Sequence, residues 1–282
     1  MRTVLPIGLH RSLLGALALL TLVLSVPAFG QSMAALLPDA PSATRDQNNA
    51  PPSSPDSGGA SSEPQSSAKS WAHRFVTDQR DIYTAPFHRS AIKWDLLFLA
   101  GTAGLIAADD HISGAIPPGS KNVSRAISNA GLIGTSAALG GILVVGLKDD
   151  DSHARETGIL GLEALANTGV VYALAQVAAG RERPLEGTGE GRFFQNNTLG
   201  SSFPSGHSAF TWTMATVIAE EYPKPWVQVL AYGTATAVSV TRVTGLEHFP
   251  ADVAVGGVTG YLIGRYVFHA HCRPGLSASC KK

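Results

Sequence analysis

The sequence has few charged residues and few cysteines. Charged side chains make up 15% of the 282 residues, well below the usual quarter, and the formal net charge is zero. Nucleic-acid surfaces need an excess of basic residues, so this balance argues against nucleic acid as a partner. A chain with so little charge either buries most of its helices or lies near a membrane.

Cysteine is nearly absent. The two cysteines, Cys272 and Cys280, are too few for a disulfide framework, and no spacing indicates a zinc site. Both lie near the C-terminal end of the sequence. In an oxidising compartment they could close a small loop of the tail.

The first 70 residues predict an exported protein. Residues 1–30 combine a weakly basic start, an apolar run at Ser12–Val26 and a small-x-small site at Ala28–Gly30. This pattern is typical of a cleaved secretory signal peptide, with an uncleaved anchor helix as the alternative. Residues 31–70 are rich in Ser, Pro, Gly and Ala without apolar periodicity, which predicts a disordered tether. Residues 71–282 remain for a folded domain in the periplasm or cell envelope.

The folded part is predicted to be all-α. Six apolar segments have helical length, abundant Ala and Leu and no alternating pattern, and Gly- and Pro-rich stretches separate them. The segments are Ile92–Ala108, Ala126–Leu147, Thr157–Ala179, His207–Glu220, Trp226–Val240 and Ala251–Phe268. We therefore expect a helical bundle of about six core helices.

Length and topology bear on whether these helices cross a bilayer. A span needs ~20 apolar residues, and two segments are that long, but Glu163 and Asn167 interrupt one of them. If the signal peptide is removed, six spans would place the basic C-terminal tail on the wrong side for the positive-inside rule. We therefore favour an exported bundle of buried, Ala- and Gly-rich helices. The alternative is a bundle associated with or integral to the inner membrane.

Four polar clusters fall at the ends of the apolar segments. They are Arg181–Pro184, Pro204–His207, Thr241–Arg242, and the pair of His248 with Asp252. If neighbouring helices run antiparallel, all four clusters converge on one rim of the bundle. Arginine side chains bind tetrahedral oxyanions through paired hydrogen bonds, and backbone N–H groups at a helix N-terminus add donors. The clusters therefore predict an oxyanion site at that rim.

Two histidines give this site its expected chemistry. His248 precedes Asp252 by four residues, so the carboxylate could accept the Nδ1 proton and leave Nε2 as a nucleophilic lone pair. His207, at the start of a helix, could donate a proton to a leaving group. Each residue has a structural alternative. Arg183 could be a loop charge, Arg242 could neutralise a helix C-terminus, and the His–Asp pair could be structural. The coincidence of all of them favours a site.

The motifs resemble those of the type 2 phosphatidic acid phosphatase superfamily, which includes bacterial class A acid phosphatases and vanadium haloperoxidases. The family signature is Lys-x6-Arg-Pro, then Pro-Ser-Gly-His, then Ser-Arg-x5-His-x3-Asp. The corresponding stretches here are Gln176–Pro184, Pro204–His207 and Thr241–Asp252. Thr241 replaces Ser and keeps the hydroxyl. Gln176 replaces Lys, so the site loses one positive charge. Arg181, five residues further on, could supply that charge instead.

By this resemblance the protein is a phosphatase that needs no metal ion or other cofactor. His248 would be the nucleophile that forms a phosphohistidine, and Asp252 would orient it. His207 would protonate the leaving alkoxide and later activate water. The residues implied to hold the phosphoryl oxygens are Arg183, Ser205, Gly206, Arg242 and, in the lysine position, Gln176.

Three functions are consistent with these motifs. The first, which we expect, is an exported phosphatase that hydrolyses phosphate monoesters or lipid phosphates. The second is a vanadium-dependent haloperoxidase with vanadate in the same anion site, which the short chain and the missing lysine disfavour. The third is a non-catalytic envelope protein that binds phosphate or lipid headgroups, which Gln176 supports. The motifs do not identify the substrate.

Overall fold

The computed structural model of the chain describes residues 64–195 and 198–280. The predicted signal peptide and most of the predicted tether therefore lie outside the described residues. Within them, every long element is an α-helix, and the one strand-like pairing is an isolated bridge between Pro274 and Ser277. The helices are α2 (Pro64–Thr84), α3 (Ile92–Gly114), α4 (Lys121–Lys148), α5 (Ser152–Ala179), α6 (Gly206–Glu221), α7 (Pro225–Thr244) and α8 (Pro250–His271).

The predicted all-α bundle is confirmed. Each of the six expected segments lies inside one of the helices α3 to α8. The short connections are a 3-10 turn at Ala85–Phe87 and another at Pro118–Ser120. A longer loop of residues 180–205 joins α5 to α6 and carries two of the polar clusters.

The helix α2 begins at Pro64, inside the segment predicted to be a tether. From Ser70 to Thr84, Asp78 is the one buried residue, and Trp71 stacks on Phe75 with ring centroids 5.5 Å apart. Extending an existing helix is easier than nucleating one. The helix therefore continues toward the N-terminus beyond the residues that hold it.

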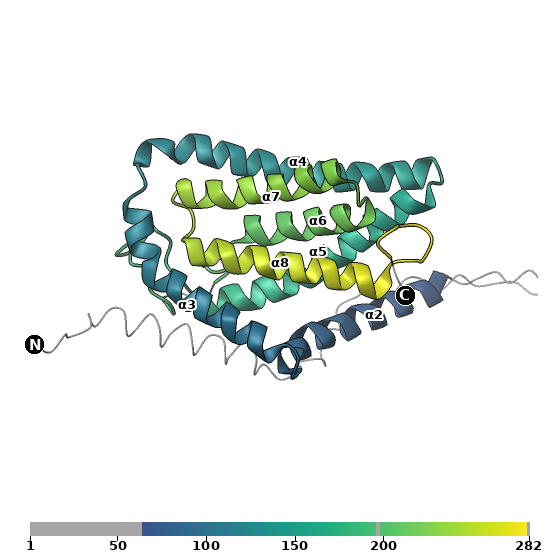
Figure 1. Cartoon of the computed structure of the whole chain (residues 1–282), viewed down its shortest axis with the longest axis horizontal. Helices are drawn as coiled ribbons and strands as arrows, with labels where there is room; N and C mark the ends of the chain where they lie inside the picture. Colours follow the sequence, from purple (N-terminus) through teal and green to yellow (C-terminus); the bar gives the residue numbers. More distant parts are fainter. Residues whose placement is uncertain (1–63, 196–197, 281–282) are drawn as a thin grey trace, which may run out of the picture.

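The bundle is organised around α6, which contacts α4, α5, α7 and α8. In Figure 1, α4, α7, α6 and α8 lie roughly parallel. Glycines repeat every four residues along α8 at Gly256, Gly260 and Gly264, and this face packs on α6. A Cβ on Gly256 would lie 2.5 Å from the carbonyl oxygen of Ser205, so only glycine allows this approach. The packing holds the first turns of α6 and α8 together.

Among the residues that the structure describes, three helices, α3, α4 and α5, are long and apolar enough to cross a membrane. The expectation that all the helices are buried is wrong for α3 and α4, because α3 packs mainly on α8 and α4 covers one side of the bundle. Their large apolar side chains that are more than 60% exposed include Trp94, Leu96, Leu97, Ile133 and Leu147. Exposed apolar surface of this extent marks contact with a membrane or another protein.

Cys272 and Cys280 form a disulfide that closes the predicted loop after α8. Both residues are buried in an apolar cluster with Leu160 and Val267. The loop therefore packs on the end of the bundle that lies away from the polar clusters.

Candidate functional site

The four polar clusters meet at one end of the bundle, where α5 and α7 end and α6 and α8 begin. Three contacts between distant segments join them. The backbone N–H of Ser205 donates to the carbonyl of Asp252 at 3.0 Å. Arg183 donates to the carbonyl of Glu247 at 2.9 Å, and Nδ1 of His248 lies 2.7 Å from the carbonyl oxygen of Ser202.

The ring of His248 is buried and has a defined tautomer. Its Nδ1 lies 2.7 Å from the Ser202 carbonyl oxygen and 3.8 Å from Oδ2 of Asp252, so the backbone is the closer acceptor. A carbonyl oxygen can only accept, so Nδ1 carries the proton and Nε2 keeps its lone pair. Burial lowers the pKa of His248, although Asp252 acts to raise it, and the ring is therefore neutral at pH 7.

Asp252 acts on this ring through Ser202 as well as directly. Its Oδ2 accepts hydrogen bonds from the Ser202 hydroxyl at 2.5 Å and from the Phe249 backbone N–H at 2.8 Å. Burial alone would raise the pKa of Asp252, but Arg181 holds it below its usual range. The ionised carboxylate therefore fixes Ser202, whose carbonyl oxygen orients His248.

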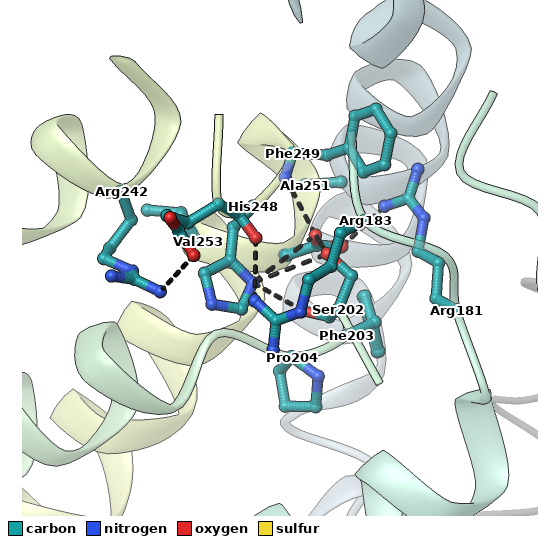
Figure 2. Close-up of polar contacts among 12 residues, drawn as sticks. Arg181, Arg183, Ser202, Phe203, Pro204, Arg242, His248, Phe249, Ala251 and Val253 are labelled. Carbon is teal, nitrogen blue, oxygen red and sulfur yellow. Dashed lines mark hydrogen bonds and ion pairs between the residues drawn. The ribbon is translucent and has the colours of Figure 1, made fainter. Parts of the chain in front are cut away.

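Arg181 is almost fully buried beneath the site. Its guanidinium donates to Asp252 at 2.6 Å, to Asp109 of α3 at 2.8 Å and to the carbonyl of Gly191 at 3.0 Å. Two rings flank it at 4.7 and 4.3 Å from their centroids, those of Phe193 and Phe249. Figure 2 shows Arg181 beside Phe249. Its charge is paired with two carboxylates, so it is poorly placed to replace the missing lysine.

Two other arginines flank the ring of His248. Figure 2 shows the His248 ring between the side chains of Arg242 and Arg183. Arg242 is buried, its closest polar contacts are at 3.5 Å, and its Nε has no hydrogen-bond partner among the described residues. Arg183 is a quarter exposed and uses one terminal nitrogen for the Glu247 carbonyl. Both guanidinium groups therefore keep donors that a phosphoryl group can take.

The first turn of α6 adds further donors. Ser205 is the N-cap residue and is fully buried, and its hydroxyl has no hydrogen-bond partner among the described residues. Gly206 lies close to Tyr172, because a Cβ added at this position would be only 3.0 Å from the tyrosine ring. The N–H groups of a first helical turn lack partners within the helix, which makes this turn suitable for an anion.

His207 lies in the same first turn and contacts Asn129 of α4, with Nε2 at 3.0 Å from Oδ1. Burial and the nearby Arg242 lower the pKa of His207 to about 4, so the free site holds a neutral ring. A phosphate anion beside this ring would raise the pKa again, because a negative charge favours the imidazolium. His207 can therefore donate a proton only when an anion is bound beside it.

Gln176, in the last turn of α5, is fully buried. Its Nε2 donates to the carbonyl of Pro204 at 2.8 Å, and its Oε1 has no partner among the described residues. The side chain thus supports the loop that carries the Pro-Ser-Gly-His motif. Direct contact of Gln176 with an anion stays a prediction.

Sequence reasoning missed two residues of this site. Asp109 directly follows the apolar segment that ends at Ala108, and a buried charge there signals a partner, but the partner, Arg181, is 72 residues away. Ser202 contributes its hydroxyl and its carbonyl from an irregular loop, for which no periodicity gives a signal.

Residues 158–274, which contain all the motif residues, match the model of the PAP2 superfamily. The chain contains a PAP2 superfamily domain. A stretch of 76 residues is 34% identical to Lipid A 1-phosphatase of Porphyromonas gingivalis, and it covers 26% of this chain and 17% of that protein. The chain thus matches less than a fifth of that relative's length.

The PAP2 domain also has a solved structural neighbour. This is described as the first transmembrane PAP2 type phosphatidylglycerolphosphate phosphatase from Bacillus subtilis. The identity is 21% and the TM-score is 0.44, with 73% of this chain and 98% of the other covered.

We expect Arg181→Met to destabilise the PAP2 domain by about 3–5 kcal/mol, because it leaves the carboxylates of Asp109 and Asp252 buried without a counter-charge. Unfolding followed by circular dichroism in denaturant measures this loss. The control is Arg155→Met, which removes an exposed pair with Asp150 and should cost less than ~1 kcal/mol. Equal losses in the two variants would contradict the account of Arg181.

Proposed function

We propose that the protein is a phosphatase that hydrolyses phosphate monoesters or lipid phosphates through a phosphohistidine at His248. This proposal rests on the surroundings of the His248 ring. The ring is buried and neutral, its Nδ1 is held by a backbone carbonyl, and two arginines with free donors lie beside it. Membership of the PAP2 superfamily supports phosphate-ester hydrolysis.

The reaction needs two displacements at phosphorus. Nε2 of His248 attacks the phosphorus atom, and the bond to the leaving oxygen breaks as His207 donates its proton to that oxygen. Water then attacks the phosphohistidine and gives its proton to His207, which releases inorganic phosphate and restores both rings. Arg183, Arg242 and the first turn of α6 stabilise the charge on the phosphoryl oxygens, so the proposed mechanism is metal-independent.

A lipid phosphate is the substrate class we favour. The similar protein of Porphyromonas gingivalis is named a lipid A 1-phosphatase, and α3, α4 and α5 could each cross a membrane. A phosphatase in the membrane meets lipid phosphates directly. Release of phosphate from lipid phosphates and from p-nitrophenyl phosphate, both in EDTA, tests this preference.

Replacement of the two histidines should have different effects. His248→Ala should abolish turnover, because no nucleophile remains. His207→Ala should retain measurable activity toward p-nitrophenyl phosphate and lose far more toward alkyl phosphates, because a good leaving group departs without a proton. Steady-state kinetics with both esters checks this difference. An equal loss with both esters in His207→Ala would refute the proton-donor role.

Gln176→Lys should strengthen binding of vanadate, a phosphate analogue. A cation near the phosphoryl oxygens adds ~1–2 kcal/mol of attraction, equivalent to about a tenfold lower inhibition constant. Gln176→Met is the control, since it keeps the length of the side chain and lacks the donor. If folded Gln176→Lys is inhibited by vanadate no better than wild type, Gln176 does not face the anion.

We also propose that the mature protein lies in the cell envelope with α3 and α4 in the membrane. The exposed apolar surface of these helices supports a location in the membrane. The disulfide supports a location in an oxidising compartment. The mature N-terminus should be near Gln31, as N-terminal sequencing would show. Alkaline carbonate should leave the protein in the membrane fraction, and its release would contradict the membrane-spanning helices.

A further inference from the structure

A second cluster of polar side chains lies near the C-terminal end of α8, away from His248. It brings together Asp78 of α2, Glu163 of α5 and His271, the last residue of α8. One ligand-type atom of each residue lies within 4.8 Å of the others. In Figure 1, α2 passes beside this end of the bundle, close to the C-terminal loop.

One oxygen of this cluster has no partner. Glu163 has no exposed side-chain surface, and its Oε2 is bound by Arg74 at 2.6 Å. Its Oε1 has no hydrogen-bond partner among the described residues and faces Nε2 of His271 at 3.9 Å. A buried carboxylate is stable only when it is paired or binds a metal ion. Arg74 pairs with one oxygen of this carboxylate, and the other oxygen is left as a ligand for a second cation.

The charges of the cluster also favour a cation. Tyr266 contacts the carboxylates of both Asp78 and Asp81, at 3.2 and 3.0 Å. Glu163 lies beside this pair, so three carboxylates gather here, and Arg74 brings one guanidinium to them. Three carboxylates outnumber the one guanidinium, so the cluster carries an excess of negative charge.

The position of Asp78 gives such a cation a structural role. Asp78 is the one buried residue from Ser70 to Thr84, and polar contacts join α2 to the bundle alongside Ile82, which packs on an apolar cluster. Gln79 donates to Asn167 at 2.6 Å, and Asn167 in turn donates to Asp78 at 3.3 Å. A helix attached in this way depends on its polar anchor.

We propose that Asp78, Glu163 and His271 bind one divalent transition-metal ion, which fastens α2 to α5 and α8. Nε2 of His271 lies 2.7 Å from Oδ1 of Asp78 and 3.9 Å from Oε1 of Glu163. Two ligand atoms that each lie ~2.1 Å from a tetrahedral ion are ~3.4 Å apart. One of the two measured distances is shorter than this value and the other is longer.

The chemistry of the donors selects the metal. Zn²⁺ binds both imidazole nitrogen and carboxylate oxygen, whereas Ca²⁺ and Mg²⁺ prefer oxygen ligands alone. The hydrogen bonds from Asn167 and Tyr266 to Asp78 are the kind of outer contacts that orient a metal-binding carboxylate. The fourth position of a tetrahedral ion is left for water.

Zinc binding by the purified full-length protein tests the proposal. The protein is stripped with EDTA and given Zn²⁺ alone, and bound zinc is measured by mass spectrometry of the metal after desalting. Wild type should retain one more zinc ion per chain than His271→Gln and than Glu163→Gln. His153→Gln is the matched control. His153 pairs with the buried Glu221 at 3.0 Å, but no third ligand joins them among the described residues.

A second measurement on wild type alone does not depend on the folding of any variant. If zinc fastens α2, added Zn²⁺ should slow protease cleavage within residues 64–84 at least tenfold, and EDTA should restore it. Retention of equal zinc by wild type and His271→Gln, or cleavage that zinc does not change, would overturn the proposal. The cluster would then be a set of direct hydrogen bonds and ion pairs between α2, α5 and α8.

Discussion

The ion pairs of Arg181 with Asp109 and Asp252 tie three distant parts of the chain into one site. Asp109 comes from α3, Arg181 from the loop after α5 and Asp252 from the first turn of α8. Asp109 also accepts a hydrogen bond from the backbone N–H of Ala251 at 3.0 Å, so it fixes the start of α8 as well. Each buried charge requires the others, because an unpaired one is strongly destabilising.

The chemistry at the rim follows from this buried charge. Arg181 keeps Asp252 ionised, Asp252 binds the Ser202 hydroxyl, and the Ser202 carbonyl fixes the tautomer of His248. The polar groups beside the His248 ring differ, since Ser205 Oγ and Arg242 Nε have no partners among the described residues. Satisfied groups thus set the geometry, and in the proposed reaction the unsatisfied groups bind the phosphoryl oxygens.

The helices could be predicted from the sequence, because apolar length and Gly/Pro punctuation are local signals. The convergence of the four clusters followed from antiparallel neighbours. The acceptor for Nδ1 of His248 could not be predicted, because a spacing of four residues brings Asp252 near without showing that the Ser202 carbonyl lies closer. Nor does the pattern show that α3 and α4 leave apolar faces uncovered, since that depends on which helices pack together.

The central claim is that Nε2 of His248 becomes phosphorylated. The most direct measurement mixes His207→Ala enzyme with p-nitrophenyl phosphate, quenches at alkaline pH, where phosphohistidine is stable, and maps the modified peptide by mass spectrometry. The account predicts one phosphoryl group on His248, which accumulates because the residue that activates water has been removed. Phosphate release without any phosphoryl group on His248, or with the group on another residue, would contradict it.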